Sequence, residues 1–417
     1  MSKQVVVIGG GIVGLCTAYY LQKEGHNVKV IDKSGMDGGA SFVNAGYLTP
    51  SHIIPLAAPG MISKGLKYMF NSASPFYMKP RLDGDFLKWA WAFKKSSTTT
   101  KVQRAMSHIR DINILSRELY DELKASSDLG NFHYERKGLL MLYQTHKEGD
   151  HEKETAEKAK SLGLQSTILD QKGIEEIEPN VSINAIGAVH YLCDGHTTPI
   201  NFMPKMIAYL KKSGVAIQKN EEVIDFSITN EKITSVITNQ SVHRMDAVVF
   251  AGGSWTSQLS KKLGIELLIQ AGKGYRVDVS KSTGITMPAL LLEAKMAVTP
   301  MLGFTRFAGT MEFSGINSKI RKERVDAIAN GAKRFYEGLE IPVEDKNNAQ
   351  CGLRPVSPDG LPYIGKSENF ENLMIATGHA MMGWSLGPAT GLLVSELISE
   401  RKSSLDLSPY YPERKFY

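Results

Sequence analysis

The start of the chain has the pattern of a strand, a turn, a helix and a second strand. Residues 5–8 are all apolar, residues 9–11 are three glycines, and residues 15–25 have helical apolar spacing. A second run, residues 28–31, is apolar except for Lys29 and ends at Asp32. Strands that are apolar throughout are typical of a sheet covered on both faces, so this order predicts a βαβ unit in a parallel sheet.

Helical and strand patterns alternate along the rest of the chain. Helical spacing is found at roughly 86–124, 152–161, 199–213, 325–338 and 388–400. Strand patterns are found at 138–143, 187–192, 215–219, 223–228, 233–238, 247–253, several times within 270–313, and at 373–377. In the first long helix, Phe86, Trp89 and Phe93 are expected to share one face, because they recur at helical spacing.

This alternation predicts an α/β fold with two domains. Strands that suit a nucleotide-binding sheet occur near both ends and in the middle of the chain. We therefore expect a discontinuous Rossmann-like cofactor domain made of residues 1–80, 146–265 and 346–417. The two remaining segments, 81–145 and 266–345, are expected to form an α+β substrate domain with an antiparallel sheet.

Gly9, Gly11 and Gly14 match the spacing G-x-G-x-x-G between the first strand and the helix. The first glycine permits a tight turn, the second lets a pyrophosphate approach the backbone, and the third lets helix and strand pack closely. The start of the helix offers free N–H groups to phosphates. Asp32 follows the second strand, where a carboxylate can accept hydrogen bonds from a ribose. The pattern predicts a bound dinucleotide, either NAD or FAD.

Composition excludes several other classes. The chain has 417 residues, 42% hydrophobic and 22% charged, which is ordinary for a globular protein. A net charge of +6 is compatible with an acidic substrate or an anionic membrane surface, but it is too small to indicate nucleic acid. Three distant cysteines suggest no metal site or disulfide framework. With no apolar run near 20 residues and no signal-peptide pattern, we expect a cytoplasmic protein.

Two C-terminal motifs resemble those of the FAD-dependent amino-acid and amine oxidoreductases. Residues 351–365, CGLRPVSPDGLPYIG, are similar to that family's G-L-R-P-x-[ST]-x-D-G-x-P-x-[IV]-G signature. Residues 378–391, GHAMMGWSLGPATG, resemble its strand-to-helix turn under the flavin. Residues 41–46, 57–60 and 273–275 are similar to the D-amino-acid dehydrogenase branch, small-subunit type. The resemblance implies FAD as cofactor.

The resemblance also implies which residues contact FAD. Those expected at the pyrophosphate are Gly9, Gly11, Ile12, Val13, Gly14, Ala251 and Gly252. Those expected at the adenosine are Asp32, where the family usually has glutamate, and Val223. Lys33 and Trp255 are also expected to contact the cofactor. Those expected at the flavin are Ser41, Asn44, Ala45, Gly46, Tyr47, Gly378, His379, Gly383, Trp384 and Ser385. Trp384 has the alternative role of a buried core aromatic.

Arg354 is the candidate for substrate binding, because a planar guanidinium binds a carboxylate in a bidentate manner. Its alternative role is a structural salt bridge. Tyr275 is expected to place a hydroxyl at the substrate, or else to be an ordinary strand aromatic. His52 is a lesser catalytic candidate. Glycine-oxidase-like members have a second arginine after the Gly-His pair, whereas this chain has Met381 and Met382, so an apolar pocket wall is expected.

The resemblance implies oxidative deamination of D-amino acids, with D-proline and D-hydroxyproline among the candidate substrates. Electrons would pass to a quinone-type acceptor, and the protein would lie peripherally on the inner face of the plasma membrane. The stretch 89–95, WAWAFKK, is aromatic and basic enough to touch a membrane, or else is a core-facing helix. Two alternatives are a glycine- or sarcosine-type oxidase that uses oxygen and a FAD-bearing subunit of a heteromeric complex. Cys351 is expected to be a small apolar residue, with FAD bound non-covalently.

Overall fold

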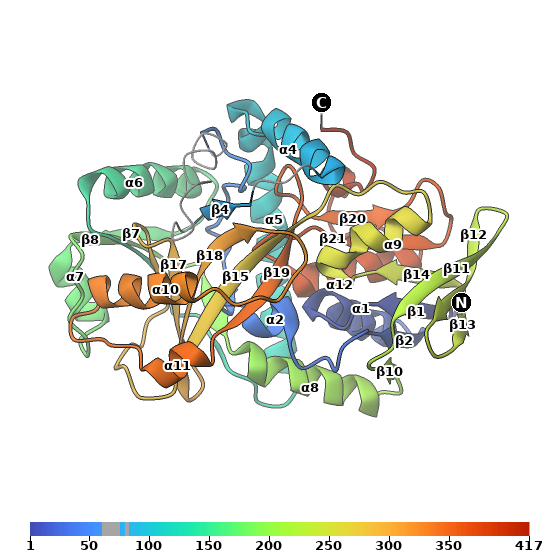
Figure 1. Ribbon diagram of the computed structural model, residues 1–417, viewed down its shortest axis with the longest axis horizontal. Coiled ribbons are helices and arrows are strands. Elements are labelled where there is room, and N and C mark those ends of the chain that lie inside the picture. The colour runs from blue at the N-terminus through green and yellow to red at the C-terminus, as the bar shows by residue number, and fades with distance from the viewer. Residues whose placement is uncertain (61–75, 80–82, 417) are drawn as a thin grey trace.

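The computed structural model describes residues 1–60, 76–79 and 83–416. Residues 61–75 and 80 of the first predicted cofactor segment, and residues 81–82 of the first predicted substrate segment, lie outside the described residues. Two large sheets lie side by side along the longest axis of the molecule (Figure 1). Two small sheets of three strands each flank them.

A six-stranded sheet contains the glycine-rich motif. Its strands, in spatial order, are β10 (Ala216–Gln218), β2 (Asn27–Ile31), β1 (Gln4–Ile8), β14 (Ala247–Phe250), β21 (Leu373–Thr377) and β20 (Tyr363–Lys366). All pairs are parallel except β20 with β21. Val5 and Val7 face one core and Val6 and Ile8 face another, so both faces of this sheet are buried. This explains why residues 5–8 of β1 and all of β14 are apolar.

The second large sheet has nine strands and is mostly antiparallel. Eight follow the order β19 (Gln350–Val356), β15 (Gln270–Val279), β18 (Phe304–Phe313), β17 (Met296–Met301), β16 (Ala289–Leu291), β6 (Leu139–Tyr143), β8 (Gly187–Tyr191) and β7 (Ser166–Leu169). The ninth, β4 (Phe76–Met78), pairs in parallel with β18. The two small sheets are β11 (Val223–Thr229), β12 (Lys232–Thr238) and β13 (Val242–Arg244), and β3 (Tyr47–Leu48), β9 (Gly195–Thr197) and β5 (Tyr134–Glu135).

Helices cover the faces of both large sheets. One core of the six-stranded sheet is shared with α1 (Ile12–Lys23), α5 (Thr99–Ser126), α8 (Pro199–Lys212) and α12 (Gly387–Ile398). Its other core includes the β11–β13 sheet and the end of α9 (Thr256–Lys262). The nine-stranded sheet packs on α10 (Lys322–Phe335) and α6 (His146–Ser161). The other α-helices within residues 1–60, 76–79 and 83–416 are α2 (Gly39–Val43), α4 (Gly84–Ser96), α7 (Gln171–Ile177) and α11 (Val343–Asn347).

The predicted domain boundaries differ from the sheet topology. Segment 146–265 was expected in the cofactor domain, yet it supplies β7 and β8 to the nine-stranded sheet. Segment 81–145 was expected in the substrate domain, yet its helix α5 packs in the core that contains α1 and α12. The strand pattern predicts that a segment pairs but not with which partner, because the partners are distant in sequence.

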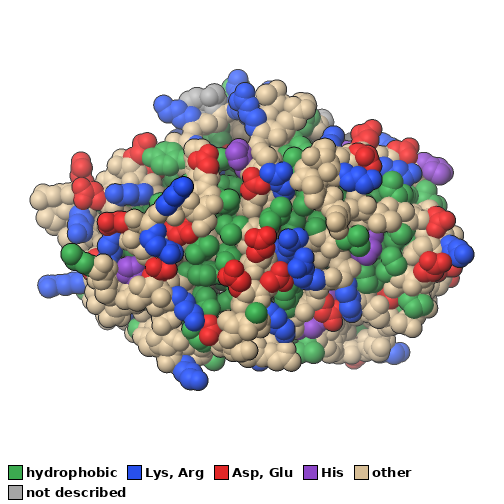
Figure 2. All heavy atoms as spheres, turned by 180° about the vertical axis from the view of Figure 1, so that it is seen from behind, with side chains coloured by type: hydrophobic (Ala, Val, Ile, Leu, Met, Phe, Trp, Pro, Cys, Tyr) green, Lys and Arg blue, Asp and Glu red, His purple; other side chains and the backbone are tan. Residues whose placement is uncertain are grey.

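The single helix expected at 86–124 is two helices, α4 and α5. They are separated at Thr98, whose hydroxyl accepts a hydrogen bond from the amide of Lys101 and so caps the second helix. None of the helices in the described part of the chain is long and apolar enough to cross a membrane. Figure 2 shows acidic and basic side chains interspersed on one face of the molecule.

Candidate functional site

A cavity of about 1380 Å³ extends between the two large sheets. Its volume exceeds that of most pockets for one small molecule, so it can hold a dinucleotide together with a substrate. It lies at the carboxyl ends of β1 and β2, where parallel sheets bind nucleotides. Of the residues predicted from the sequence, those that line it are Gly9, Gly11, Ile12, Val13, Asp32, Lys33, Ser41, Asn44, Ala45, Tyr47, His52, Val223, Ala251, Gly252, Trp255, Arg354, His379, Gly383, Trp384 and Ser385.

The glycine-rich turn allows backbone contacts that no other residue type allows. Gly9 has φ +117°, and a Cβ there would lie 2.4 Å from the carbonyl oxygen of Ala251. A Cβ at Gly14 would lie 1.9 Å from the carbonyl oxygen of Gly9. These two close approaches bring the start of α1 against β1 and β14. The hydroxyl of Ser41 accepts a hydrogen bond of 2.9 Å from the amide of Ile12 and so links this turn to α2.

Asp32 holds the glycine-rich turn from the end of β2. One carboxylate oxygen accepts a hydrogen bond of 2.6 Å from the amide of Gly10. The other accepts from the amide and the hydroxyl of Ser34, at 2.7 and 2.6 Å. On the same side of the cavity, the ammonium of Lys33 lies 4.2 Å from the centre of the Trp255 ring. Asp32, Lys33, Val223 and Trp255 therefore form a polar and aromatic end of the cavity that suits a nucleotide.

The turn before α12 forms another wall. Trp384 is buried, and its indole N–H donates a 2.7 Å hydrogen bond to the hydroxyl of Thr197. The hydroxyl of Ser385 donates to the side-chain oxygen of Asn113 at 2.7 Å and accepts from the amide of Thr49 at 3.1 Å. These bonds fix the turn to β9, α5 and the strand region after β3. The turn is thus a rigid surface against which a flat ring can lie.

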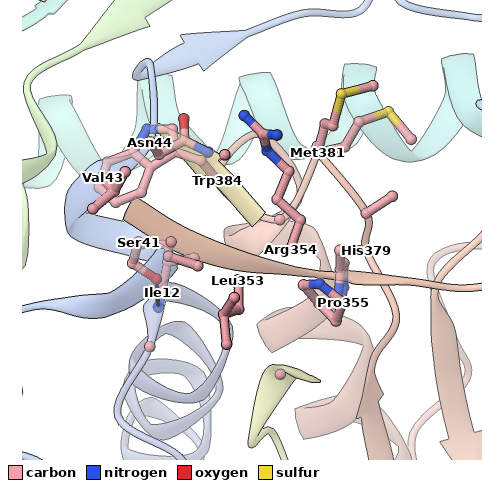
Figure 3. Close-up of a pocket in the computed structure, with 18 of the residues that line it drawn as sticks. Ile12, Ser41, Val43, Asn44, Leu353, Arg354, Pro355, His379, Met381 and Trp384 are labelled. Atoms are coloured by element: carbon pink, nitrogen blue, oxygen red, sulfur yellow. Dashed lines mark hydrogen bonds between the residues drawn. The ribbon is translucent and has the colours of Figure 1, made fainter. Parts of the chain in front are cut away.

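Arg354 projects from β19 into the cavity, and in the view of Figure 3 it lies between Trp384 and Met381. One guanidinium nitrogen donates a 2.8 Å hydrogen bond to the carbonyl oxygen of Thr310. A Cβ at Gly274 would lie 2.2 Å from this guanidinium, so the glycine of the neighbouring strand makes room for it. Within the described residues no carboxylate lies within 4.0 Å of its nitrogens. The expected alternative, a structural salt bridge, is therefore not observed there.

Arg354 lies in the same cavity as His52 and His379, and burial affects the pKa of all three groups. Burial lowers the pKa of Arg354 to about 10, so the guanidinium stays charged at neutral pH. Burial also lowers the pKa of His52 to about 4 and that of His379 to about 3, so both rings are neutral. The ring of His379 is held at 2.9 Å by the hydroxyl of Thr390. Arg354 can therefore attract an anionic group without competition from a positive charge on His52 or His379.

The prediction for Tyr275 needs correction. Successive side chains of a strand point to opposite faces, and Gly274 is the neighbour that faces the cavity. Tyr275 is fully buried on the other face, where its hydroxyl donates a 2.8 Å hydrogen bond to the carboxylate of Glu312. Cys351 pairs with Tyr275 across the two strands and shares this face. Neither side chain lines the cavity.

Three predicted cofactor residues, Gly14, Gly46 and Gly378, shape the cavity without lining it. Gly46 and Gly378 have positive φ, and a Cβ at Gly46 would lie 2.2 Å from the carbonyl oxygen of Thr197. The sequence reasoning missed cavity residues from the nine-stranded sheet and from α6, among them Met141, Glu152, Tyr191, Thr310 and Met311. These residues belong to no recognisable motif. The one indication in the sequence is Glu152, a charged residue among the small residues on the buried face of α6.

Glu152 is a buried acid in this cavity. Its carboxyl group accepts a 2.7 Å hydrogen bond from the hydroxyl of Tyr191. Burial raises the pKa of Glu152 to about 7, against 4.5 in the unfolded chain. At pH values between 4.5 and 7, the carboxyl group of Glu152 is protonated in the folded state and ionised in the unfolded state. Folding stability is therefore reduced as the pH rises from 4.5 to 7, by up to about 3 kcal/mol.

We expect Glu152→Gln to raise the thermal unfolding midpoint at pH 8 and to have little effect at pH 5. The amide keeps the shape of the side chain and an oxygen for Tyr191 but never ionises. Thermal denaturation at both pH values measures this, with exposed Glu154→Gln on the same helix as the control. An equal change at both pH values would show that ionisation of Glu152 has no such cost.

Comparison with known proteins agrees with this geometry. The family model described as "FAD dependent oxidoreductase" matches residues 4–397. D-amino acid dehydrogenases from Helicobacter pylori and Granulibacter bethesdensis are 32% and 30% identical to the chain, with 95% and 97% of both chains covered. Glycine oxidase from Geobacillus kaustophilus has a TM-score of 0.78 at 21% identity, with 99% of both chains covered. The L-proline dehydrogenase from P. horikoshii has a TM-score of 0.73 at 22% identity, with 99% of this chain and 97% of the other covered. The predicted fold class and the predicted cofactor, FAD, are confirmed.

Proposed function

Because the chain belongs to the FAD-dependent oxidoreductase family, we propose that it oxidises D-amino acids to 2-oxo acids and ammonia and passes the electrons to a quinone-type acceptor. The observation that carries this proposal is Arg354, a charged guanidinium that is free of carboxylate partners among the described residues and projects into the cofactor cavity. The names of the relatives at 30% identity or more support the choice of D-amino acids and of a dehydrogenase.

Bound FAD supplies a hydride acceptor. We assign the pyrophosphate to the turn at Gly9–Gly11 and the start of α1, and the adenosine to Asp32, Lys33, Val223 and Trp255. The flavin ring would lie against Ser41, Asn44, Ala45, Tyr47 and the turn Gly383–Ser385. The start of α12, directly after this turn, would favour negative charge next to it.

Arg354 would hold the substrate carboxylate through two parallel N–H donors, which fixes the position of the α-carbon. The substrate amine reacts in its neutral form, and the α C–H bond breaks with loss of a hydride. The amine then loses a proton and an imino acid results, which water hydrolyses to a 2-oxo acid and ammonia. Neutral His52 and His379 place no positive charge against this amine, which suits its deprotonated form. Met381 and Met382 line the cavity and favour an apolar side chain or ring.

Anaerobic flavin bleaching tests this proposal. The purified holoenzyme is mixed under nitrogen with D- and L-amino acids, proline derivatives and sarcosine, and the loss of flavin absorbance is followed. We expect bleaching by D-amino acids or D-imino acids, with re-oxidation by a quinone analogue. Peroxide formation in air at the rate of turnover would instead favour the glycine- or sarcosine-type oxidase. No bleaching by any of these compounds would favour the non-catalytic subunit of a complex.

We expect FAD to be bound non-covalently. Arg354 lies on the face of β19 that lines the cavity, whereas Cys351 lies on the other face and packs beside Tyr275. The thiol of Cys351 therefore has no access to the cofactor. After precipitation with acid, the yellow colour should remain in the supernatant. Colour retained in the pellet, and lost in Cys351→Ser, would show that this thiol carries the flavin.

The outer face of α4 is our candidate for membrane contact. Phe86, Trp89 and Phe93 are buried in the core, as expected for a core-facing helix. Leu87 and Trp91 on the other face are 54% and 57% exposed. The ammonium of Lys95 lies 5.1 Å from the centre of the Trp91 ring. An exposed apolar pair beside lysines combines apolar area with positive charge, and both contribute to binding an anionic membrane surface.

We expect the double variant Leu87→Gln, Trp91→Gln to sediment with anionic phosphatidylglycerol vesicles at least about tenfold less than the wild type, because two apolar side chains are lost from the contact. Ile224→Gln is the control, since Ile224 is 46% exposed on β11, distant from α4 in Figure 1. Equal sedimentation of the double variant and the wild type would exclude this face as the membrane contact.

A further inference from the structure

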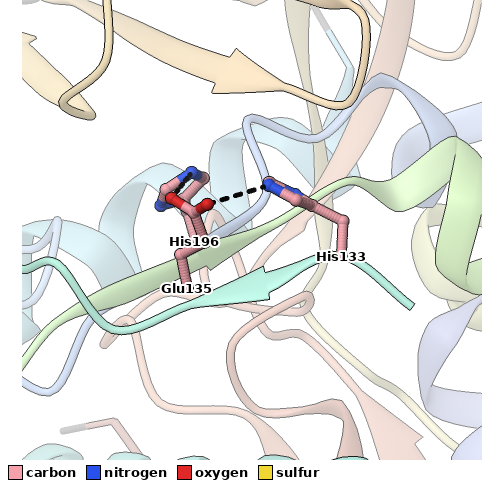
Figure 4. A group of neighbouring side chains, drawn as sticks. All are labelled: His133, Glu135 and His196. Atoms are coloured by element: carbon pink, nitrogen blue, oxygen red, sulfur yellow. Dashed lines mark ion pairs between the residues drawn. The ribbon is translucent and has the colours of Figure 1, made fainter. Parts of the chain in front are cut away.

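Two histidines and a glutamate gather in the small sheet β3–β9–β5, outside the cofactor cavity (Figure 4). His133 and Glu135 are two residues apart on an extended segment, so their side chains point the same way. Glu135 pairs directly with His196 on the neighbouring strand β9. One potential ligand atom from each of the three residues lies within 4.8 Å of the other two. This spacing is set by the strand register.

The distances are close to those of a metal site. The Nε2 atom of His133 lies 3.7 Å from one oxygen of Glu135, and the Nε2 atom of His196 lies 3.8 Å from the other. A tetrahedral zinc ion with bonds near 2.0–2.1 Å holds its ligand atoms about 3.3 Å apart. Side-chain rotations that move these atoms by a few tenths of an ångström would bring each Nε2 atom to that separation from a carboxylate oxygen of Glu135.

His196 provides an independent observation. The side chain is completely buried, and within the described residues neither ring nitrogen makes a well-aligned hydrogen bond, although the backbone of Pro300 lies near the ring. A buried polar atom without a partner costs free energy, so such atoms usually mark a missing ion or water. The Nδ1 atom of His133 lies 2.8 Å from the hydroxyl of Thr198, a contact that can orient the ring for binding through Nε2.

We propose that His133, Glu135 and His196 bind a divalent transition-metal ion of the zinc class. Two imidazoles and one carboxylate are a ligand set that suits this class of ion. The ammonium of Lys137 now lies 2.7 Å from one oxygen of Glu135. It is 48% exposed, so it can turn to solvent when the ion enters. Spacing alone could not reveal the site, because His196 lies far along the chain from the other two ligands.

The ion would fix β5 to β9 behind the cofactor cavity. Thr197, next to His196, accepts the hydrogen bond from the indole of Trp384, which lines that cavity. The proposed site is therefore one residue away from the wall of the cavity, while its ligands do not line it. Its role would be structural, and it does not depend on the proposed reaction.

Zinc binding to the FAD-loaded enzyme tests this proposal. The protein is treated with a chelator, dialysed, and equilibrated with zinc chloride, and bound zinc is measured by elemental analysis and isothermal titration. We expect one ion per chain and a zinc-dependent rise of the unfolding midpoint. Glu135→Gln and His133→Gln should each weaken the affinity by at least about 10-fold, because the loss of a ligand costs more than the loss of a hydrogen bond to a ligand. His146→Gln removes an exposed histidine outside the cluster and should bind as the wild type does.

Flavin absorbance and circular dichroism identify variants that fail to fold. If both variants fail to fold, the zinc titration of the wild-type protein decides whether the site exists. Wild-type protein that retains no zinc at micromolar free metal would overturn the proposal. Zinc binding that is unchanged in both Glu135→Gln and His133→Gln would also overturn it, since the ion would then bind elsewhere.

Discussion

Arg354→Ala is expected to abolish useful turnover while FAD stays bound. The substitution removes a charge-assisted, bidentate contact to the substrate carboxylate, and such a loss costs about 2–5 kcal/mol of transition-state binding. The value of kcat/KM should fall roughly 30- to 5,000-fold. Arg354→Lys should also fail substantially, because an ammonium cannot reproduce the planar fork. Steady-state kinetics with an artificial electron acceptor, together with flavin absorbance, measure both effects.

Two further variants make this test specific. Gly274→Ala places a Cβ 2.2 Å from the guanidinium and should raise KM by displacing Arg354, with FAD still bound. Arg401→Ala, which removes a surface arginine paired with Glu24, should leave the kinetics unchanged. If Arg354→Ala left kcat/KM within a few fold of the wild type, the carboxylate would be bound elsewhere.

Gly14→Ala is expected to yield protein that has lost most of its FAD. The added Cβ would lie 1.9 Å from the carbonyl oxygen of Gly9, and backbone cannot move aside as a flexible side chain can. Overpacking of this kind costs about 3 kcal/mol, which corresponds to FAD binding that is roughly 100-fold weaker. The ratio of flavin to protein absorbance after gel filtration measures the loss.

Gly84→Ala is the matched control for this variant, because a Cβ there meets no atom within 4 Å. Circular dichroism distinguishes loss of FAD from loss of the fold. Gly9→Ala provides a second variant of the same turn, since its Cβ would meet the carbonyl oxygen of Ala251 at 2.4 Å. Full FAD content in both Gly9→Ala and Gly14→Ala would show that this turn does not shape the cofactor site.

The motifs that could be recognised from the sequence are those made by neighbouring residues. The strand at 5–8, the glycine turn and Asp32 lie within one βαβ unit, so local spacing predicted their arrangement. The other predicted residues that line the cavity come from segments far apart in the chain, and the resemblance to a known family, not local spacing, indicated that they meet. Arg354 belonged to a motif of consecutive residues, and its position in the cavity follows from the alternation of side chains along β19.

The parts that the sequence left open depend on pairing between distant strands. Tyr275 and Gly274 are adjacent, and only the register of β15 with its neighbours decides which of them faces the cavity. Glu152 enters the cavity because α6 packs on β6 and β8, and no pattern within the helix specifies that contact. The same applies to His196, whose partners Glu135 and Tyr47 come from two other segments.

The order of strands in the six-stranded sheet has a consequence for synthesis of the chain. β1 and β2 are made first, but β1 pairs on its other side with β14, and β14 pairs with β21, more than 120 residues later. A growing chain therefore carries an unpaired, apolar strand edge until the final quarter of the sequence has emerged. Sheets completed by such long-range pairing form slowly and aggregate easily while incomplete. Production at low temperature or with added chaperones should thus increase the yield of folded protein. Addition of FAD during synthesis should not have the same effect, because FAD does not cover the unpaired strand edge.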